Sequence, residues 1–128
     1  MRAVVQRSRH SRVEVNSVNE GEISRGLVVL LGIKRADQIS DGEYLMDKIL
    51  NLRVFEDNDG KMNRSLLEVG GEILLISQFT LYAHCRRGRR PSFSEAADPG
   101  PAESLVEEFR QALECMGVPT AAGRFGAH

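Results

Sequence analysis

Tryptophan is absent from this chain, and the five phenylalanines and two tyrosines bring the aromatic fraction to only 5%. A core must therefore be built mainly from valine, isoleucine and leucine. No apolar run approaches the ~20 residues that a membrane-spanning helix needs. The chain also lacks a Walker loop, a G-x-G-x-x-G fingerprint and an H-E-x-x-H motif, so the common nucleotide-binding and zinc-protease signatures are missing.

Cysteine is scarce as well, with Cys85 and Cys115 thirty residues apart and no Cys-x-x-Cys motif. This usage is typical of reduced thiols in the cytosol. Charge interrupts the N-terminal stretch 1–7 too early for a signal peptide, so we expect a cytoplasmic protein with no membrane partner. The histidines are too scattered along the chain to predict a metal site: His10, His84 and His128.

The composition is otherwise that of an ordinary globular protein, with 41% hydrophobic and 27% charged residues in 128. Apolar alternation and β-branched runs predict strands, and 3.6-residue periodicity predicts two helices. The order of strands, helix, strands, helix indicates an α/β or α+β fold with one domain over residues 1–128. The expected strands are 2–7, 13–15, 27–33, 53–56 and 72–81, and the expected helices are 40–52 and 101–116.

Local signals predict where these elements begin and end. Ser40 and Glu43 have the spacing of a capping box at the start of the first helix. The sequence 57–60, Asp-Asn-Asp-Gly, indicates a hairpin turn. Gly117 is placed to end the second helix. The apolar run 27–33 is the best candidate for a strand covered on both faces.

The motif Ser77-Gln78-Phe79-Thr80-Leu81 ends an apolar strand with polar side chains. Thr80 is a candidate nucleophile, but a nucleophilic threonine needs a general base, and threonine is also a common structural residue of strands. Gln78 and the backbone N–H groups around Phe79 have another candidate role, because they could stabilise a developing oxyanion. His84 and Cys85 make a poor catalytic dyad, since neighbours on a strand point to opposite faces.

Net charge is only −1, yet four arginines fall within 86–90 and are followed by Pro91-Ser92-Phe93. Such a cluster is often a solvated loop. Arginine also suits bidentate contact with phosphate, and Phe93 is suited to stacking on a base. Gln6 and Arg7 end the first strand. They are either polar residues at the edge of the sheet or residues that line a cleft. The arginines of the candidate RNA-binding loop are Arg86, Arg87, Arg89 and Arg90.

Several spaced motifs together resemble the D-aminoacyl-tRNA deacylase (D-tyrosyl-tRNA deacylase) family over essentially the whole chain. The most specific is Ser-Gln-Phe-Thr-Leu at 77–81, in the form of the bacterial-type enzyme. The others are Met-Arg-Ala-Val-Val-Gln-Arg at 1–7, Gly-Leu-Val-Val-Leu-Leu-Gly at 26–32, the segments 48–55 and 60–63, Arg-Arg-Pro-Ser-Phe at 89–93, and Gly-Arg-Phe-Gly at 123–126.

The resemblance implies a translation proofreading hydrolase that cleaves the ester joining a D-amino acid, or glycine, to the 3′ end of tRNA. It implies a homodimer with the site at the interface, and a mostly antiparallel, curved or barrel-like sheet flanked by two helices. Gln78, Phe79 and Thr80 would hold the aminoacyl-adenosine, while the ribose 2′-OH assists the attack. Neither a cofactor nor a DNA partner is expected. The residues expected nearby are Gln6, Arg7, Ser77 and Phe93.

The chain departs from the family pattern in two segments. Residues 8–12, Ser-Arg-His-Ser-Arg, add charge next to Gln6 and Arg7. The family's C-terminal strands and their Gly-Pro motif, which exclude L-amino acids, have no counterpart in 1–128. This departure favours an alternative hypothesis, a module that binds an RNA 3′ end or adenine nucleotide without productive turnover. A third hypothesis is a dimeric scaffold whose arginine loop binds other nucleic acid.

Overall fold

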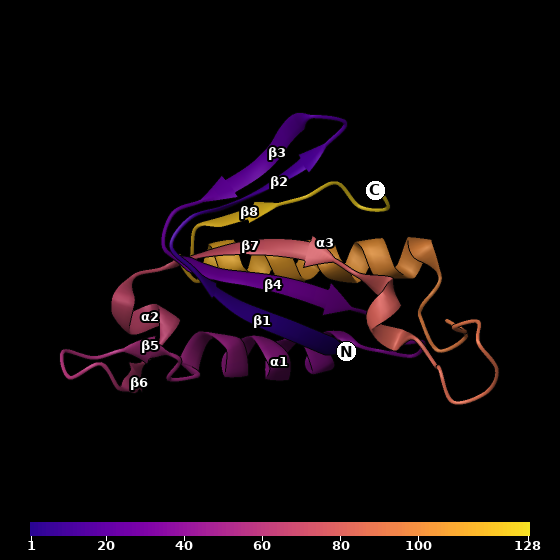
Figure 1. Ribbon diagram of the computed structural model, residues 1–128, viewed down its shortest axis with the longest axis horizontal. Helices are drawn as coiled ribbons and strands as arrows, with labels where there is room; N and C mark the ends of the chain where they lie inside the picture. The colour runs from indigo at the N-terminus through magenta and orange to yellow at the C-terminus, as the bar shows by residue number, and fades with distance from the viewer.

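A computed structural model describes residues 1–128, and its centre is a four-stranded sheet (Figure 1). The strand order is β1-β4-β7-β8, with two further ribbons, β2-β3 and β5-β6. The strands of the central sheet are β1 (Arg2–Ser8), β4 (Gly26–Gly32), β7 (Glu72–Ser77) and β8 (Thr120–Ala122). The ribbons are β2 (Ser11–Val15) with β3 (Val18–Ile23), and β5 (Phe55–Glu56) with β6 (Met62–Arg64).

The central sheet is mixed and open, which corrects the expected barrel-like, mostly antiparallel core. β1 pairs with β4 in the antiparallel sense, but β4 with β7 and β7 with β8 are parallel pairs. The parallel pairs follow from helical crossovers, since a helix between two strands returns the chain to the same edge. β1 and β8 end the sheet on opposite sides and do not pair with each other. The fold is therefore α+β, without barrel closure.

Two long helices cover one face of the sheet, and a third helix of four residues brings the count above the expected two. The helices are α1 (Ile39–Asn51), α2 (Leu66–Val69) and α3 (Pro99–Cys115). α1 and α3 pack on each other and on the sheet. Fifteen buried side chains form the core, among them Leu27, Val29 and Leu31 of β4 with Phe109 and Leu113 of α3. Leucine, isoleucine and valine dominate this cluster, as the composition predicted.

The ends of the elements confirm some local predictions and correct others. α1 begins at Ile39, where the Asp41 carboxylate accepts a hydrogen bond from the Gln38 N–H at 2.8 Å, so the Ser40–Glu43 box is wrong by two residues. The turn at 57–60 does join β5 to β6, and the Gly60 N–H donates to the Asp57 carbonyl at 3.1 Å. The strand expected at 53–56 is shorter, starting only at Phe55.

The face of the sheet opposite the helices is less well covered. Side chains alternate along a strand, so Val28 and Leu30 point away from the helices and are only partly buried. Val4 of β1 lies on the same side and is 49% exposed. The β2-β3 ribbon folds against the β7 and β8 side of the sheet and leaves the β1 side open (Figure 1). The run 27–33 is therefore covered fully on one face only.

Candidate active site

β7 stops at Ser77, and residues Phe79–Tyr82 form a short 3₁₀ turn, η1, where the sequence predicted continued strand to residue 81. The Gln78 N–H still donates to the Leu31 carbonyl of β4 at 2.8 Å, and the chain turns directly afterwards. Gly32 makes room for this turn. A Cβ atom there would lie 3.1 Å from the Gln78 carbonyl oxygen and 3.1 Å from the Leu81 Cβ.

Arg2, a residue that the sequence analysis did not single out, contacts the turn through its side chain. Its Nη1 donates to the Leu81 carbonyl at 2.8 Å, and its guanidinium carbon lies 4.5 Å from the centre of the Tyr82 ring. Tyr82 is buried, and this burial raises the pKa of its phenol, so the contact is between a cation and a neutral ring. Arg2 and Leu81 are 79 residues apart in sequence, and only the β1-β4-β7 order brings them together.

The polar groups of η1 are hydrogen-bond donors without a neighbouring base. The Gln78 side-chain amide donates to the Thr80 hydroxyl oxygen, and no carboxylate or imidazole contacts that hydroxyl. Threonine needs a base to become a nucleophile, so this geometry favours a lining role for Thr80. Phe79 and Thr80 are the first two residues of the turn. Their N–H groups donate none of the backbone hydrogen bonds made in turns and loops. Free N–H groups of this kind can stabilise a developing negative charge on a carbonyl oxygen.

The structure brings Phe93 next to Phe79, although the two are separated by the arginine loop. The ring centres are 5.3 Å apart, and the planes meet edge to face at 71°. Phe79 is 56% exposed and Phe93 36% exposed. A pair of rings with open faces is a platform on which a nucleic-acid base can stack.

The loop that carries the arginines is closed at its base. His84 and Ser92 exchange backbone hydrogen bonds of 2.7 and 3.0 Å, and His84 Nε2 lies 2.9 Å from a carboxylate oxygen of Glu95. His84 is therefore not paired with Cys85, whose side chain is exposed.

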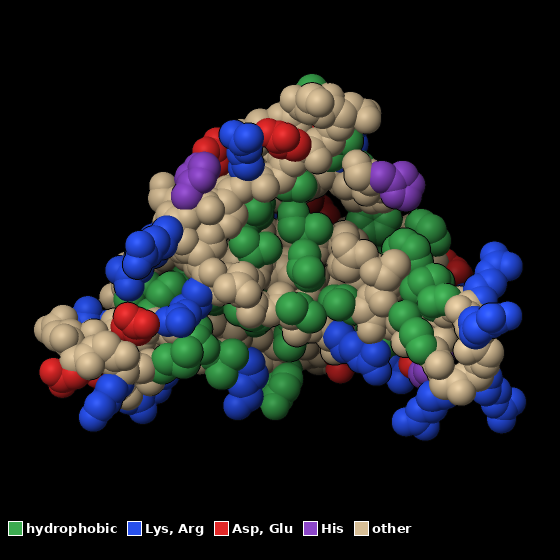
Figure 2. Space-filling model, viewed as in Figure 1, with side chains coloured by type: hydrophobic (Ala, Val, Ile, Leu, Met, Phe, Trp, Pro, Cys, Tyr) green, Lys and Arg blue, Asp and Glu red, His purple; other side chains and the backbone are tan.

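The four guanidinium groups of this loop make no ion pair and no side-chain hydrogen bond. All four arginines are exposed: Arg86, Arg87, Arg89 and Arg90. Figure 2 shows Lys and Arg side chains at both ends of the long axis, with apolar side chains across the middle of the viewed face. The loop lies at the end of the molecule that also carries η1 (Figure 1), so it offers unpaired positive charge beside the turn.

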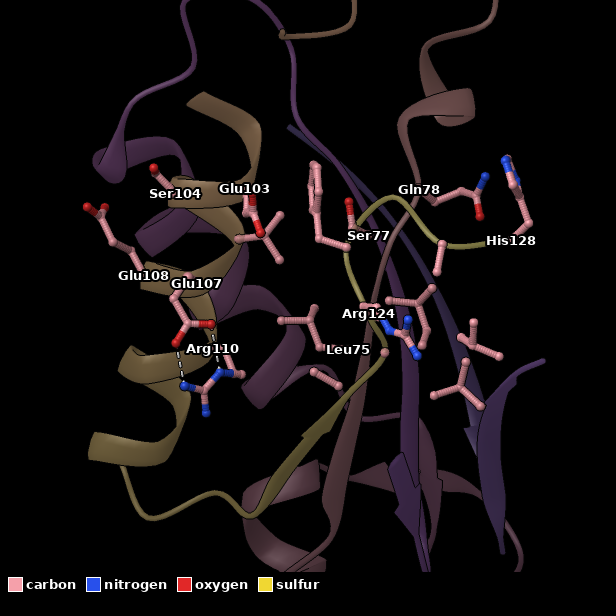
Figure 3. Close-up of a pocket in the computed structure, with 18 of the residues that line it drawn as sticks. Leu75, Ser77, Gln78, Glu103, Ser104, Glu107, Glu108, Arg110, Arg124 and His128 are labelled. Atoms are coloured by element: carbon pink, nitrogen blue, oxygen red, sulfur yellow. Dashed lines mark hydrogen bonds and ion pairs between the residues drawn. The ribbon is translucent and has the colours of Figure 1, made fainter. Parts of the chain in front are cut away.

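A hollow of about 970 Å³ lies between α3 and the C-terminal end of β7 and adjoins the turn (Figure 3). Ser77 and Gln78 line one wall, and Glu103 and Glu107 of α3 lie across from them. Phe79, Thr80 and Phe93 are outside this groove. The turn is therefore an exposed site that meets the groove through Ser77 and Gln78.

Gln6 and Arg7 lie at the other end of the sheet from the turn. Gln6 is level with Val28 of β4, which is level with Leu74 of β7. Leu74 precedes Gln78 by four residues, a rise of ~13 Å along a strand. Within one copy of the chain, Gln6 and Arg7 thus do not meet Gln78 and Thr80, and their role in substrate binding stays a prediction.

No group of three or more His, Cys, Asp or Glu side chains is arranged to hold a metal ion. None of the helices is both long and apolar enough to cross a lipid bilayer. The groups present at η1 and beside it are amide and hydroxyl groups, backbone donors, aromatic rings and guanidinium groups.

The fold and the turn define an α+β protein with an exposed site of hydrogen-bond donors, stacked rings and cations. The family model described as D-Tyr-tRNA(Tyr) deacylase matches residues 4–128. The chain therefore belongs to the D-aminoacyl-tRNA deacylase family, which consists of hydrolases that proofread charged tRNA.

Two bacterial relatives, both described as D-aminoacyl-tRNA deacylase, are similar over nearly all of this chain. The protein of Desulfatibacillum aliphaticivorans is 56% identical over 127 residues, which are 99% of this chain and 87% of that protein. The protein of Clostridioides difficile (strain 630) is 54% identical over 128 residues, covering 100% of this chain and 86% of that protein.

Two solved structures have the same fold. One, described as c-Myc DNA Unwinding Element Binding Protein, superposes with a TM-score of 0.93 at 40% identity, covering 100% of this chain and 87% of that chain. The other, described as a probable eukaryotic D-amino acid tRNA deacylase, has a TM-score of 0.79 at 17% identity and covers 98% of this chain and 89% of that one. The second likeness supports the fold alone.

Proposed function

We propose that the protein hydrolyses the ester bond of D-aminoacyl-tRNA and releases a free D-amino acid and tRNA. Membership of the deacylase family supports the reaction. So do the two relatives described as D-aminoacyl-tRNA deacylase, whose sequences are 56% and 54% identical to this chain. The observation that carries the site assignment is the cluster at η1. There a donor pair, Gln78 and Thr80, lies beside two stackable rings and four unpaired guanidinium groups.

The geometry suggests a division of roles at this site. The terminal adenine stacks on Phe79 and Phe93, and the arginine loop contacts the RNA phosphates. The N–H groups of Phe79 and Thr80 donate to the ester carbonyl oxygen and stabilise the oxyanion that forms when water attacks. The tRNA 2′-OH assists this attack, because no protein carboxylate or imidazole contacts Thr80. The C–O bond to the ribose then breaks, and the ribose oxygen takes up a proton.

Three finer features of the proposal go with this assignment. The substrates include glycine carried by a non-cognate tRNA, since a site of main-chain donors does not need an amino-acid side chain. Residues 1–128 form one deacylase domain, and the single buried cluster that joins the sheet to α1 and α3 supports this. Two copies pair as a homodimer with the site at the interface. The apolar, partly uncovered face of the sheet near Val4 and Leu30 is available for that contact.

The second candidate function is binding of an RNA 3′ end or other nucleic acid without turnover. The four unpaired arginines favour it, because free cations bind phosphate whether or not hydrolysis follows. The solved relative at 40% identity, described as c-Myc DNA Unwinding Element Binding Protein, points in the same direction.

Release of D-tyrosine and of L-tyrosine from matched charged tRNA separates these functions. The deacylase proposal predicts release of D-tyrosine at a rate far above that of L-tyrosine and of spontaneous hydrolysis. Salt-dependent tRNA binding with no release of either isomer would instead establish the binding function. Release of both isomers at the same rate would mean an ester hydrolase that does not distinguish chirality.

A further inference from the structure

A second hollow, of about 540 Å³, lies at the far end of the sheet from η1. It is formed where β1 ends and β4 begins, beside the β5-β6 ribbon. Arg7, Arg9 and Arg25 line it together with Phe55 and Glu56. In Figure 1 this is the end of β1 away from the label N, near α2 and the small ribbon. The roles proposed at η1 do not involve Arg9, Arg25, Phe55 or Glu56.

The hollow holds more positive than negative charge. Three guanidinium groups face one carboxylate, Glu56, which lies 3.8 Å from Arg7 in an ion pair whose side chains are 37% and 61% exposed. An exposed pair at that separation is weak and can exchange partners. Arg9 and Arg25 make no ion pair and donate no hydrogen bond. Two cations are thus left without a partner anion in the same concave site.

Arg25 is held in place although it is unpaired. Its guanidinium carbon lies 5.4 Å from the centre of the Phe55 ring, and Phe55 is only 4% exposed. Stacking on a fixed ring restrains the plane of a guanidinium group and leaves its N–H edge free for a bidentate acceptor. Phosphate oxygens match that edge in spacing and charge.

We propose that this hollow binds a phosphate group of the RNA backbone, at the end of the sheet opposite η1 of the same copy. The inference rests on the proposed function, which supplies an RNA. Arg7 is level with Leu27 and Ile73, and β7 continues for four residues to Ser77 before the turn. The hollow is thus at least ~13 Å from η1. When one copy supplies both sites, a phosphate held in the hollow therefore belongs to the body of the RNA and not to the terminal nucleotide.

The test is a double variant, Arg9→Gln with Arg25→Gln, assayed on two substrates. One substrate is D-tyrosyl-tRNA, and the other is the D-tyrosyl ester of adenosine, which has no phosphate. The expected result is a rise of about tenfold in KM for the tRNA, with kcat unchanged. Hydrolysis of the adenosine ester should not change. An unchanged KM for tRNA, or an equal loss on both substrates, overturns the proposal.

Lys61→Gln is the matched control. Lys61 is exposed on the β5-β6 turn, near the hollow but outside it, and its side chain makes no ion pair. Loss of its charge should leave KM for tRNA within about twofold, because a single rim charge contributes little. A rise as large as that of the double variant would mean a general charge effect and would overturn a defined phosphate site. The single variant Arg9→Gln gives a second measurement. Arg9 is exposed and its side chain makes no ion pair or hydrogen bond, so this protein is expected to fold normally.

Binding of uncharged tRNA keeps the test independent of catalysis. The slope of log affinity against log salt, measured between about 50 and 200 mM, should become shallower by roughly one in the double variant. If the wild-type protein hydrolyses neither substrate, the proposed function is wrong. The salt slope then still tests whether the hollow binds an RNA phosphate. Inorganic phosphate supplies the last comparison. If inorganic phosphate binds in the hollow but the tRNA slope stays unchanged, the RNA assignment is overturned.

Discussion

The exposed ring pair gives the most quantitative prediction, through the variant Phe79→Ala. Stacking of a base on an aromatic side chain contributes about 1–3 kcal/mol. Its loss should raise KM for D-tyrosyl-tRNA by about 5- to 150-fold, since 1.4 kcal/mol corresponds to a factor of ten. Alanine keeps the backbone N–H at position 79, so kcat should fall by no more than about threefold if that N–H is the catalytic donor.

The cost of the same substitution in stability should be small, because Phe79 is 56% exposed. The lost edge-to-face contact with Phe93 contributes ~0.5–1.5 kcal/mol, and the buried part of the ring ~1 kcal/mol. For a domain of this size, we expect the melting temperature to fall by at most about 10 °C. Steady-state deacylation and a thermal melt on the same protein preparation measure both effects.

Met116→Ala is the matched control for this experiment. Met116 is also 56% exposed and lies at the end of α3 remote from η1. Its truncation should leave KM unchanged. The reasoning is refuted if Phe79→Ala leaves KM for tRNA at the wild-type value, or if the methionine variant raises KM as much.

Further predictions concern the backbone around the turn and the base of the arginine loop. In Gly32→Ala, the added Cβ would lie 3.1 Å from the Gln78 carbonyl oxygen, so kcat/KM should fall by about tenfold or more in a protein that still melts cooperatively. In Gly26→Ala, the Cβ would lie 1.8 Å from a carbonyl oxygen of β7, so stability should fall by about 3 kcal/mol or more, and a melt close to wild type would contradict this packing. The pKa of Glu95 lies below its ordinary 4.5 because His84 donates a hydrogen bond to it. The pair therefore stabilises the loop above about pH 4.5 and is lost as the pH falls through the lowered pKa. Glu95→Gln should reduce amide protection at the loop base at pH 6, and its difference from the wild type should shrink as the pH falls below 4.5 through the lowered pKa. A difference that does not change with pH would refute the linkage.

The sequence predicted those elements whose signals are local. The apolar run at 27–33 became β4, and the Asp-Asn-Asp-Gly turn joins β5 to β6. The strand predicted to continue through residues 78–81 was wrong for a physical reason. Contacts with other strands override the strand propensity of these residues. The turn depends on the space over Gly32 and on the hydrogen bond from Arg2 to Leu81, neither of which appears in the local pattern.

The candidate site was predictable to a similar extent. The motif at 77–81 and the arginine loop are contiguous in sequence, so reading along the chain found them. Arg2 and the pair of His84 with Glu95 depend on tertiary contacts that a single sequence does not reveal. The position of Gln6 also depends on tertiary structure. Because β1 runs antiparallel to β4, the C-terminal end of β1, which carries Gln6, lies at the end of the sheet opposite η1.

The central claim, that the backbone donors of η1 hydrolyse D-aminoacyl-tRNA, is tested most directly by comparing Phe79→Pro with Phe79→Ala. The measurement is the single-turnover rate of D-tyrosine release from tRNA at saturating protein. Both variants lose the ring, but only proline removes the N–H of residue 79, at the first position of the turn. The account therefore predicts that the proline variant is slower than the alanine variant by about 100-fold or more, with the same affinity for uncharged tRNA. Equal rates in the two variants would contradict the account.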